Sequence, residues 1–259
     1  MIIDAHIHLW NRLHGEDTGI HREALTWGRA REGDTVYYAC PPAFHDSLST
    51  YERALAQMEC SGVARAVVLQ EFMDGKQDDY LAEVRRHEPQ RFSCLALFDR
   101  RFYEDPRAAF AEAIGEKRLQ GFLVKTPDPF PEIVTPALQP VWDACAERGL
   151  PVVLKNGAPE TVRALLKATP GLKVVFSHFA GAWDPIETFR ERLRIAADHP
   201  NVTIDGGGLT YRHRYPFPYP KELLHEAVET VGAHKIAWGS DYPRPGLVVE
   251  ASYQQQIDF

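Results

Sequence analysis

MIIDAHIH, residues Met1–His8, is an apolar run that ends in two histidines spaced two positions apart. Its isoleucines favour a β-strand, and in a strand residues i and i+2 point to the same face. His6 and His8 would therefore point to one side and could converge on one metal ion or one substrate atom. Metal chemistry is the first hypothesis that this stretch supports.

Similar apolar runs recur along the chain and alternate with longer amphipathic segments. The expected strands cover residues 1–9, 63–71, 92–98, 121–126, 151–156, 173–178, 201–206 and 235–241. The expected helices cover residues 49–60, 78–87, 106–116, 136–148, 160–168, 185–197 and 220–231. Asp105 before Pro106 predicts an N-cap followed by a proline at the first helical position, and Ser49 with Glu52 predicts a capping box.

Eight successive strand–helix units predict the fold class. They fill 259 residues without a shift in composition that would mark a boundary. We therefore expect one α/β domain over residues 1–259, a (β/α)8 TIM barrel, in preference to an open doubly wound sheet. The last helix, which would close the barrel, is expected to be short or absent. No GxGxxG or Walker loop follows the first strand, which weakens nucleotide-binding alternatives.

The composition limits the classes of partner. Hydrophobic residues make up 44% of the chain and charged residues 25%, as in ordinary globular proteins. A formal net charge of −7 argues against general nucleic-acid binding, which needs a basic surface. No run suggests a membrane span or a signal peptide. Four scattered cysteines without CxxC spacing predict reduced thiols and a cytoplasmic location.

Titratable residues gather at the ends of the expected strands, where a barrel places its catalytic groups. In strand order they are His6 and His8, Glu71, Lys125, Lys155, His178, Asp205 and Asp241. His6, His8 and Asp241 suit Zn²⁺ or a similar divalent ion, since the first and eighth strands are neighbours in a closed barrel. His178 is either a further metal ligand or a base for the attacking water.

The other strand-end residues have plainer interpretations. Glu71 and Asp205 could cap strands or pair with nearby cations instead of taking a direct role. Lys125 could equally form a structural ion pair in the mouth of the barrel.

Two long connections are expected to form the catalytic rim. Residues 10–43 are too long for a barrel turn and predict a lid or binding loop. Residues 206–220 join three glycines to a stiff basic and aromatic segment, and its aromatics favour a substrate wall: Tyr211, Tyr215, Phe217 and Tyr219. Positive charge around the mouth predicts a small anionic substrate bound by Arg212, His213, Arg214, Arg244 and Lys155. A homodimer is a reasonable expectation for such a barrel.

Three motifs carry a family resemblance. DAHIHLW at residues 4–10, VFSHFAG at residues 175–181 and WGSDYP at residues 238–243 resemble the HxH, sixth-strand His and GSDxP motifs of the amidohydrolase superfamily. The branch that the chain resembles most contains small lactonases and aminocarboxymuconate-semialdehyde decarboxylase-like enzymes. The resemblance implies that His6, His8 and Asp241 bind or face the metal and that His178 is catalytic.

The fifth strand departs from that family pattern. Lys155 stands where the family's ligand histidine would be expected, and a protonated lysine cannot donate a lone pair to a metal. Three outcomes remain open: a metal bound without that ligand, a modified or deprotonated Lys155, or a metal-free site in which Lys155 supplies the positive charge.

The resulting prediction is a hydrolase that opens a small carboxylated lactone with activated water. Asp241, with His178, would accept the proton of the water, while a metal ion or Lys155 stabilises the oxyanion. The alternatives are a metal-dependent non-oxidative decarboxylase of a similar anion and a catalytically silent barrel that only binds a small molecule.

Overall fold

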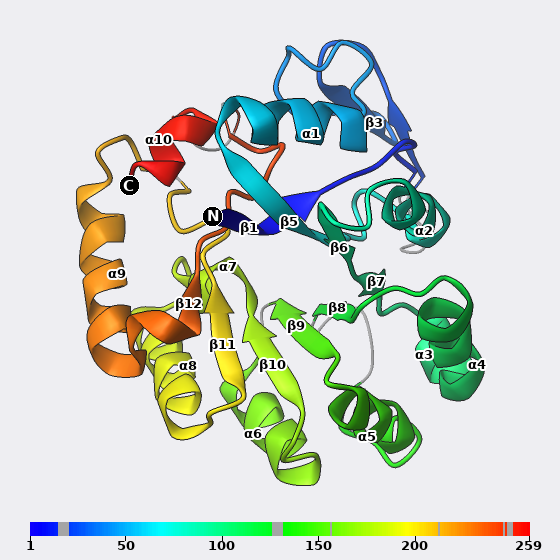
Figure 1. Ribbon diagram of the computed structural model, residues 1–259, viewed down its shortest axis with the longest axis vertical. Coiled ribbons are helices and arrows are strands. Elements are labelled where there is room, and N and C mark those ends of the chain that lie inside the picture. Colours follow the sequence, from blue (N-terminus) through cyan, green and yellow to red (C-terminus); the bar gives the residue numbers. More distant parts are fainter. Residues whose placement is uncertain (15–20, 126–131, 156, 212, 246, 248–250) are drawn as a thin grey trace.

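The structure, a computed structural model, describes residues 1–14, 21–125, 132–155, 157–211, 213–245, 247 and 251–259. Figure 1 shows its parallel strands arranged around a ring, with helices on the outside. The ring strands are β1 (Ile2–His8), β5 (Val63–Leu69), β6 (Phe92–Cys94), β7 (Ala96–Leu97), β8 (Phe122–Lys125), β9 (Pro151–Lys155), β10 (Lys173–Phe176), β11 (Val202–Asp205) and β12 (Ile236–Ala237).

Short and long helices follow these strands. They are α1 (Tyr51–Cys60), α2 (Asp78–His87), α3 (Arg101–Glu104), α4 (Pro106–Phe110), the π-helical η2 (Ala111–Glu116), α5 (Gln139–Arg148), α6 (Pro159–Ala168), α7 (Ser177–Gly181), α8 (Ile186–Asp198), α9 (Pro218–Val231), the 3₁₀-helix η3 (Ala233–Lys235) and α10 (Tyr253–Ile257). The predicted strand–helix alternation is therefore confirmed, with boundaries that differ by a few residues.

The strands form one parallel ring. Hydrogen-bonded neighbours run β1–β5–β6 on one side and β12–β11–β10–β9–β8–β7 on the other. Only Leu95 separates β6 from β7, so a single strand path joins the two sheets. On the other side the backbone N–H of Ala5 donates to Trp238 O at 2.9 Å, and that of Asp241 donates to His6 O at 2.8 Å. These bonds join β1 to the chain that leaves β12, as a (β/α)8 barrel requires.

Side-chain alternation along β9 explains how a polar group reaches the barrel interior. Val152 and Leu154 belong to the large apolar cluster that the helices cover. Val153 belongs instead to a small cluster with Leu97 and Leu123. Because side chains two residues apart share a face of a strand, Lys155 follows Val153 toward the interior, at the carboxyl end of the strand.

A small antiparallel sheet interrupts the first strand–helix unit. It consists of β2 (Arg22–Ala24), β3 (Arg29–Glu32) and β4 (Thr35–Tyr38), paired in that order. Figure 1 shows it outside the ring, near α1. The predicted lid or binding loop therefore has a folded sheet of its own within its described residues.

Some local predictions need correction. Asp105 caps α4 as expected, because its carboxylate accepts the N–H of Ala108 at 3.1 Å. Ser49 does not cap α1, whose N-cap is Thr50, because its hydroxyl instead donates to His8 O at 2.8 Å. The last helix described, α10, is five residues long. Among the described residues, no helix is long and apolar enough to cross a membrane.

Candidate active site

His6 and His8 converge at the end of β1, as the sequence predicts. His6 Nδ1 donates to Asp205 Oδ1 at 2.8 Å, since a carboxylate oxygen only accepts. His8 Nδ1 likewise donates to the backbone carbonyl of Leu69 at 3.1 Å. Each neutral ring therefore keeps a lone pair on Nε2, and the two Nε2 atoms lie 3.1 Å apart. Two facing lone pairs at that distance need a cation or a proton between them.

Asp241 completes this arrangement from the end of the eighth strand path. Its Oδ1 lies 3.0 Å from His8 Nε2 and 3.7 Å from His6 Nε2. That oxygen is buried and has no hydrogen-bond partner among the described residues. Zn–N bonds of about 2.0–2.1 Å place neighbouring tetrahedral ligands roughly 3.4 Å apart. The three donor atoms thus fit a divalent ion, and their outer hydrogen bonds orient them as ligands.

The pKa shifts of His6 and Asp241 agree with the close approach of the two side chains. Burial works against ionisation of His6, but the attraction of Asp205 and then of Asp241 raises its pKa to about 9. Burial likewise opposes ionisation of Asp241, yet His6 and His8 hold its pKa well below the ordinary range. Asp241 is therefore an anion, and positive charge is favoured at His6.

His178 approaches the same point from α7, through an unusual backbone turn. His178, Phe179 and Ala180 all have φ near +53 to +54°, a left-handed conformation that L-residues seldom adopt. Such strain gathers at functional sites, where the surrounding structure holds it in place. One donor atom each of His178, His6 and Asp241 lie within 4.8 Å of one another.

The His178 ring is buried and electrically neutral. Burial is the main cause that holds its pKa well below the ordinary value, and the neighbouring Lys155 charge adds to it. Neither ring nitrogen has a hydrogen-bond partner among the described residues. Its Nδ1 lies 3.7 Å from Asp241 Oδ2. A buried imidazole with both nitrogens unpaired is suited to a metal, a water molecule or a substrate atom.

Lys155 forms an ion pair with Glu71, between Lys155 Nζ and Glu71 Oε1. Burial opposes ionisation of Glu71, but the charges of Lys155 and His8 and the hydrogen bond from Lys155 together lower the pKa of that carboxyl. Glu71 Oε1 also lies 4.0 Å from His178 Nε2. The pair places the Lys155 ammonium group beside His178, apart from the three donor atoms of His6, His8 and Asp241.

Tyr211 contacts the other oxygen of Asp241. Its phenol donates to Asp241 Oδ2, and its ring stacks on Trp183 with centroids 5.5 Å apart and planes at 17°. Burial and the Asp241 charge raise the pKa of the phenol well above its ordinary value, so the proton stays on Tyr211.

Three glycines bring the loop after β11 past the histidines. A Cβ on Gly207 would lie 2.4 Å from His6 Nδ1. A Cβ on Gly208 would lie 2.7 Å from the Trp183 ring and 2.9 Å from His178 Nδ1, and its φ of +72° also favours glycine. The backbone of these glycines therefore passes close beside the site, where a side chain would not fit.

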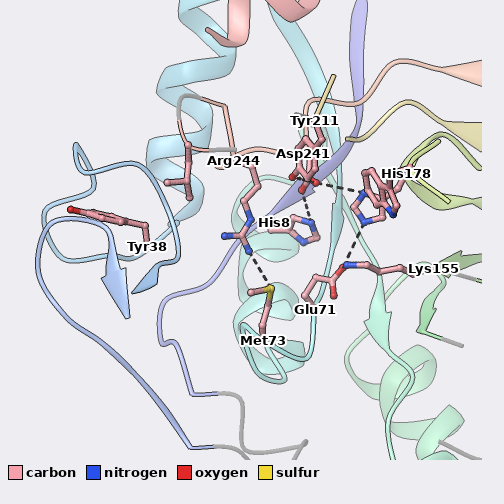
Figure 2. A pocket seen from close by; sticks show the side chains of 11 residues that line it. His8, Tyr38, Glu71, Met73, Lys155, His178, Tyr211, Asp241 and Arg244 are labelled. Atoms are coloured by element: carbon pink, nitrogen blue, oxygen red, sulfur yellow. Dashed lines mark hydrogen bonds and ion pairs between the residues drawn. The ribbon is translucent and has the colours of Figure 1, made fainter. Parts of the chain in front are cut away.

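A cavity of about 360 Å³ opens over these groups. Figure 2 shows Arg244 and Met73 on one side, Lys155 and His178 on the other, and Asp241 with Tyr211 between them. The described residues that line it are His8, Tyr38, Glu71, Met73, Lys155, His178, Trp183, Tyr211, Asp241, Arg244 and Leu247.

Arg244 is a buried cation, and not all of its N–H groups have a partner among the described residues. Its Nη1 donates to the Ala39 carbonyl and its Nη2 to Met73 Sδ at 3.4 Å. The carboxylate oxygen that faces it, Asp74 Oδ1, lies 3.9 Å from Nη2. A guanidinium offers five N–H donors, so further donors can serve a ligand in the cavity.

The structure brings most of the predicted site residues together. His6, His8, Lys155, His178, Asp241 and Arg244 gather at one end of the barrel. His213 lies in an adjoining hollow of about 220 Å³, and Trp183 and Tyr211 line both spaces. Arg214 is exposed and does not line the cavity. Arg212 lies outside the described residues.

Lys125 does not line the cavity. It lies opposite Lys155 in the register of the parallel β8–β9 pair. Of the four aromatics expected in a substrate wall, Tyr211 lines the cavity. Sequence reasoning missed Tyr38, Met73, Asp74 and Trp183, because these residues lie on connections with no periodic pattern. For Tyr38, the only signal in the sequence was its place in the long connection, residues 10–43, that is expected to form a lid.

A family comparison agrees with this fold. The family model described as Amidohydrolase matches residues 3–259. The chain belongs to the amidohydrolase family. Members of this family are enzymes and commonly bind a divalent metal. Among curated proteins no sequence match is found.

Three solved structures illustrate the shared fold. An amidohydrolase from Burkholderia multivorans with bound zinc has 18% identity and a TM-score of 0.72, covering 100% of this chain and 89% of that one. A Pseudomonas putida protein named as a candidate 2-pyrone-4,6-dicarboxylic acid hydrolase has 22% identity and a TM-score of 0.69, covering 99% and 89%. A 5-carboxyvanillate decarboxylase from Sphingomonas paucimobilis has 19% identity and a TM-score of 0.58, covering 82% and 76%.

Proposed function

We propose that this amidohydrolase opens a small lactone that carries a carboxylate. The observation that carries the proposal is the setting of Asp241: one oxygen faces the two histidine Nε2 atoms, and the other lies beside neutral His178 at the cavity. A buried carboxylate so placed suits the activation of a water molecule. The name of the similar Pseudomonas putida structure, a candidate hydrolase of a carboxylated lactone, supports this substrate class.

His6, His8 and Asp241 would hold a divalent ion, with His178 near enough to be a further ligand. Such an ion supplies a Lewis acid, which polarises a carbonyl and acidifies water. Asp205 and the Leu69 carbonyl keep the two ligand rings in the tautomer that binds a metal. Lys155 is then an additional charge and not a replacement ligand.

The chain's own groups perform the proton transfer and the positioning. Asp241 Oδ2 accepts a proton from the water whose oxygen attacks the lactone carbonyl carbon. His178, 3.7 Å from that oxygen, passes the proton to the ring oxygen that leaves when the C–O bond breaks. Lys155 stabilises the negative charge that develops on the carbonyl oxygen.

Arg244 selects for the carboxylate of the substrate. Its guanidinium is buried, and the N–H donors that have no partner among the described residues match the bidentate geometry of a carboxylate. An overall acidic protein gains a local attraction for an anion in this way.

Decarboxylation is the second candidate function. The specific observation in its favour is the shared fold with the 5-carboxyvanillate decarboxylase. The same cations would bind the carboxylate of a phenolic acid, so the products, and not the geometry of the cavity, separate the two reactions.

The test is a substrate screen. Purified protein, with and without added Zn²⁺ or Mn²⁺, is offered carboxylated lactones, including 2-pyrone-4,6-dicarboxylate, and carboxylated phenols. We expect acid release from a lactone and no carbon dioxide. Asp241→Asn should lower kcat by about 10²–10⁴-fold. Asp143→Asn, on the exposed face of α5, is the matched control and should match the wild type.

Three results would overturn the proposal. Carbon dioxide release would favour the decarboxylase. Binding of these acids without turnover of any of them would favour a silent binding barrel. Near-normal turnover by Asp241→Asn would remove Asp241 from the role of base.

A further inference from the structure

Tyr211 occupies the oxygen of Asp241 that the proposed hydrolysis needs. The phenol donates its hydrogen bond to Asp241 Oδ2, while Oδ1 faces His8 Nε2 at 3.0 Å. The oxygen that would receive the proton is therefore already hydrogen-bonded before a substrate arrives. While the phenol donates to Oδ2, one lone pair of that oxygen cannot receive the proton of a water molecule.

The loop geometry places the phenol beside the cavity and not only against Asp241. Tyr211 follows the three glycines, and its backbone N–H donates to Gly208 O at 3.0 Å. The stack on Trp183 holds the plane of the ring, and both aromatic residues line the cavity. The hydroxyl hydrogen is free to rotate about the C–O bond, so it can point to Asp241 or to a ligand atom in the cavity.

Other groups are less suited to donate a hydrogen bond to a developing oxyanion there. Neutral His178 has one N–H, and the proposed mechanism uses this ring as a proton carrier. Lys155 Nζ is paired with Glu71 Oε1. Tyr211 is thus a neutral donor within reach of both the base and the cavity, as Figure 2 shows for Asp241 and Tyr211.

We propose that Tyr211 is a catalytic residue whose O–H donates to Asp241 in the resting enzyme and to the substrate oxyanion during attack by water. This inference rests on the proposed lactone hydrolysis. In the step, a new bond forms between the water oxygen and the carbonyl carbon, and the carbonyl π pair moves to the carbonyl oxygen. The water proton moves to Asp241 Oδ2, whose lone pair the phenol has released. Tyr211 keeps its proton throughout and changes only its acceptor.

The test compares Tyr211→Phe with the wild type on the lactone that the wild type opens fastest. The variant keeps the ring and its stack on Trp183 but loses the donor. Loss of one oxyanion donor costs about 10²–10³-fold in rate, so we expect a fall of that size in kcat. KM should stay within about threefold, because the donor acts after substrate binding. Calorimetric binding of the ring-opened acid should be unchanged for the same reason.

Tyr51→Phe is the matched control. Tyr51 begins α1, on a different part of the chain, and does not line the cavity. This variant should retain the kcat, the KM and the product affinity of the wild type.

The outcomes separate this inference from the proposed function. If the wild type opens no carboxylated lactone, the proposed function fails and this inference fails with it. If the wild type is active and Tyr211→Phe retains its kcat, only the inference is wrong. A parallel loss of kcat and of product affinity would show that Tyr211 merely supports the pocket, and would overturn the inference as well.

Discussion

Asp205 shows how one residue outside the cavity sets the chemistry of another. Its Oδ1 accepts the Nδ1–H of His6 at 2.8 Å and the backbone N–H of Gly207 at 2.9 Å. The first bond fixes the His6 tautomer, so that Nε2 faces His8 and Asp241 with its lone pair. Asp205 is therefore a partner of His6 and does not line the cavity, whereas the sequence offered a strand cap, a partner of a nearby cation or a direct role.

Substitution of Asp205 tests this role. Asp205→Asn replaces the anion beside His6 Nδ1 with a weaker, neutral acceptor, and we expect about 10–100-fold lower zinc affinity with little change in fold. Competition with a chromophoric chelator measures the affinity, and circular dichroism checks the fold. Asp143→Asn serves again as the control. Unchanged zinc affinity in Asp205→Asn would mean that His6 is not held as a ligand by this bond.

The residues that sequence reasoning found share a physical origin. They end strands of a parallel ring or follow such strands within a few residues, and a barrel brings these ends together without knowledge of any loop: His6, His8, Lys155, His178 and Asp241. The contact of Tyr211 with Asp241 depends instead on the path of an irregular connection. Its conformation follows from tertiary packing and has no periodic signal in the sequence.

At the scale of elements, the connection after β11 passes close to His6 because it lacks side chains. Its glycines are packed against the site. Gly207 leaves no room for a methyl group beside His6 Nδ1. The connection after β11 therefore packs against the His6 ring and limits where this ring can lie.

Gly207→Ala should disturb both the fold and the site. Its Cβ would meet His6 Nδ1 at 2.4 Å, so the ring must shift. We expect the free energy of unfolding to fall by about 1–3 kcal/mol and zinc affinity to fall more than about tenfold. Gly115→Ala is the control, since nothing lies within 4 Å of its added Cβ and the substitution favours a helix. Equal behaviour of the two variants in urea unfolding and zinc titration would contradict the close passage.

A second element, η2, is tied to its surroundings by Glu112. The hydrogen bond from Lys117, 2.6 Å away, is the largest cause that lowers the pKa of Glu112 to about 2, and Arg101 adds to it from 2.8 Å. A carboxyl whose pKa is lower in the folded state contributes stability above its unfolded pKa. That contribution is lost as the pH falls from about 4.5 toward 2.

Glu112→Gln should therefore flatten the acid limb of stability. Between pH 5 and pH 3 the wild type should lose more free energy of unfolding than the variant, because the amide does not titrate. Urea unfolding at several pH values measures the difference. Parallel curves for the two proteins would show that the folded and unfolded pKa values of Glu112 are alike.

For the whole molecule, the closed barrel could be predicted but the contacts that close it could not. Repeated strand–helix units and right-handed crossovers determine which strands are neighbours. The seam is different, since β12 has only two residues and the chain beyond it pairs with β1 through irregular backbone bonds. The buried carboxylate of Asp4, which no motif marks as structural, joins the two sides of that seam.

Asp4 should be essential to this closure. Its Oδ1 accepts the backbone N–H groups of His6 at 3.1 Å and Ser240 at 2.9 Å. Its Oδ2 accepts the hydroxyls of Ser240 at 2.5 Å and Tyr253 at 2.7 Å. Asp4→Ala leaves these buried donors without an acceptor, and we expect the free energy of unfolding to fall by about 3–5 kcal/mol.

Urea unfolding of Asp4→Ala, with Asp4→Asn and exposed Asp34→Ala beside it, measures this contribution. Asp4→Asn should lose less than the alanine variant, because its amide oxygen still accepts from part of the network. Asp34→Ala should stay within about 0.5 kcal/mol of the wild type. Because the seam also carries His6 and Asp241, the Asp4 variants should lose zinc affinity together with stability. A stable Asp4→Ala protein would show that the backbone bonds alone close the barrel.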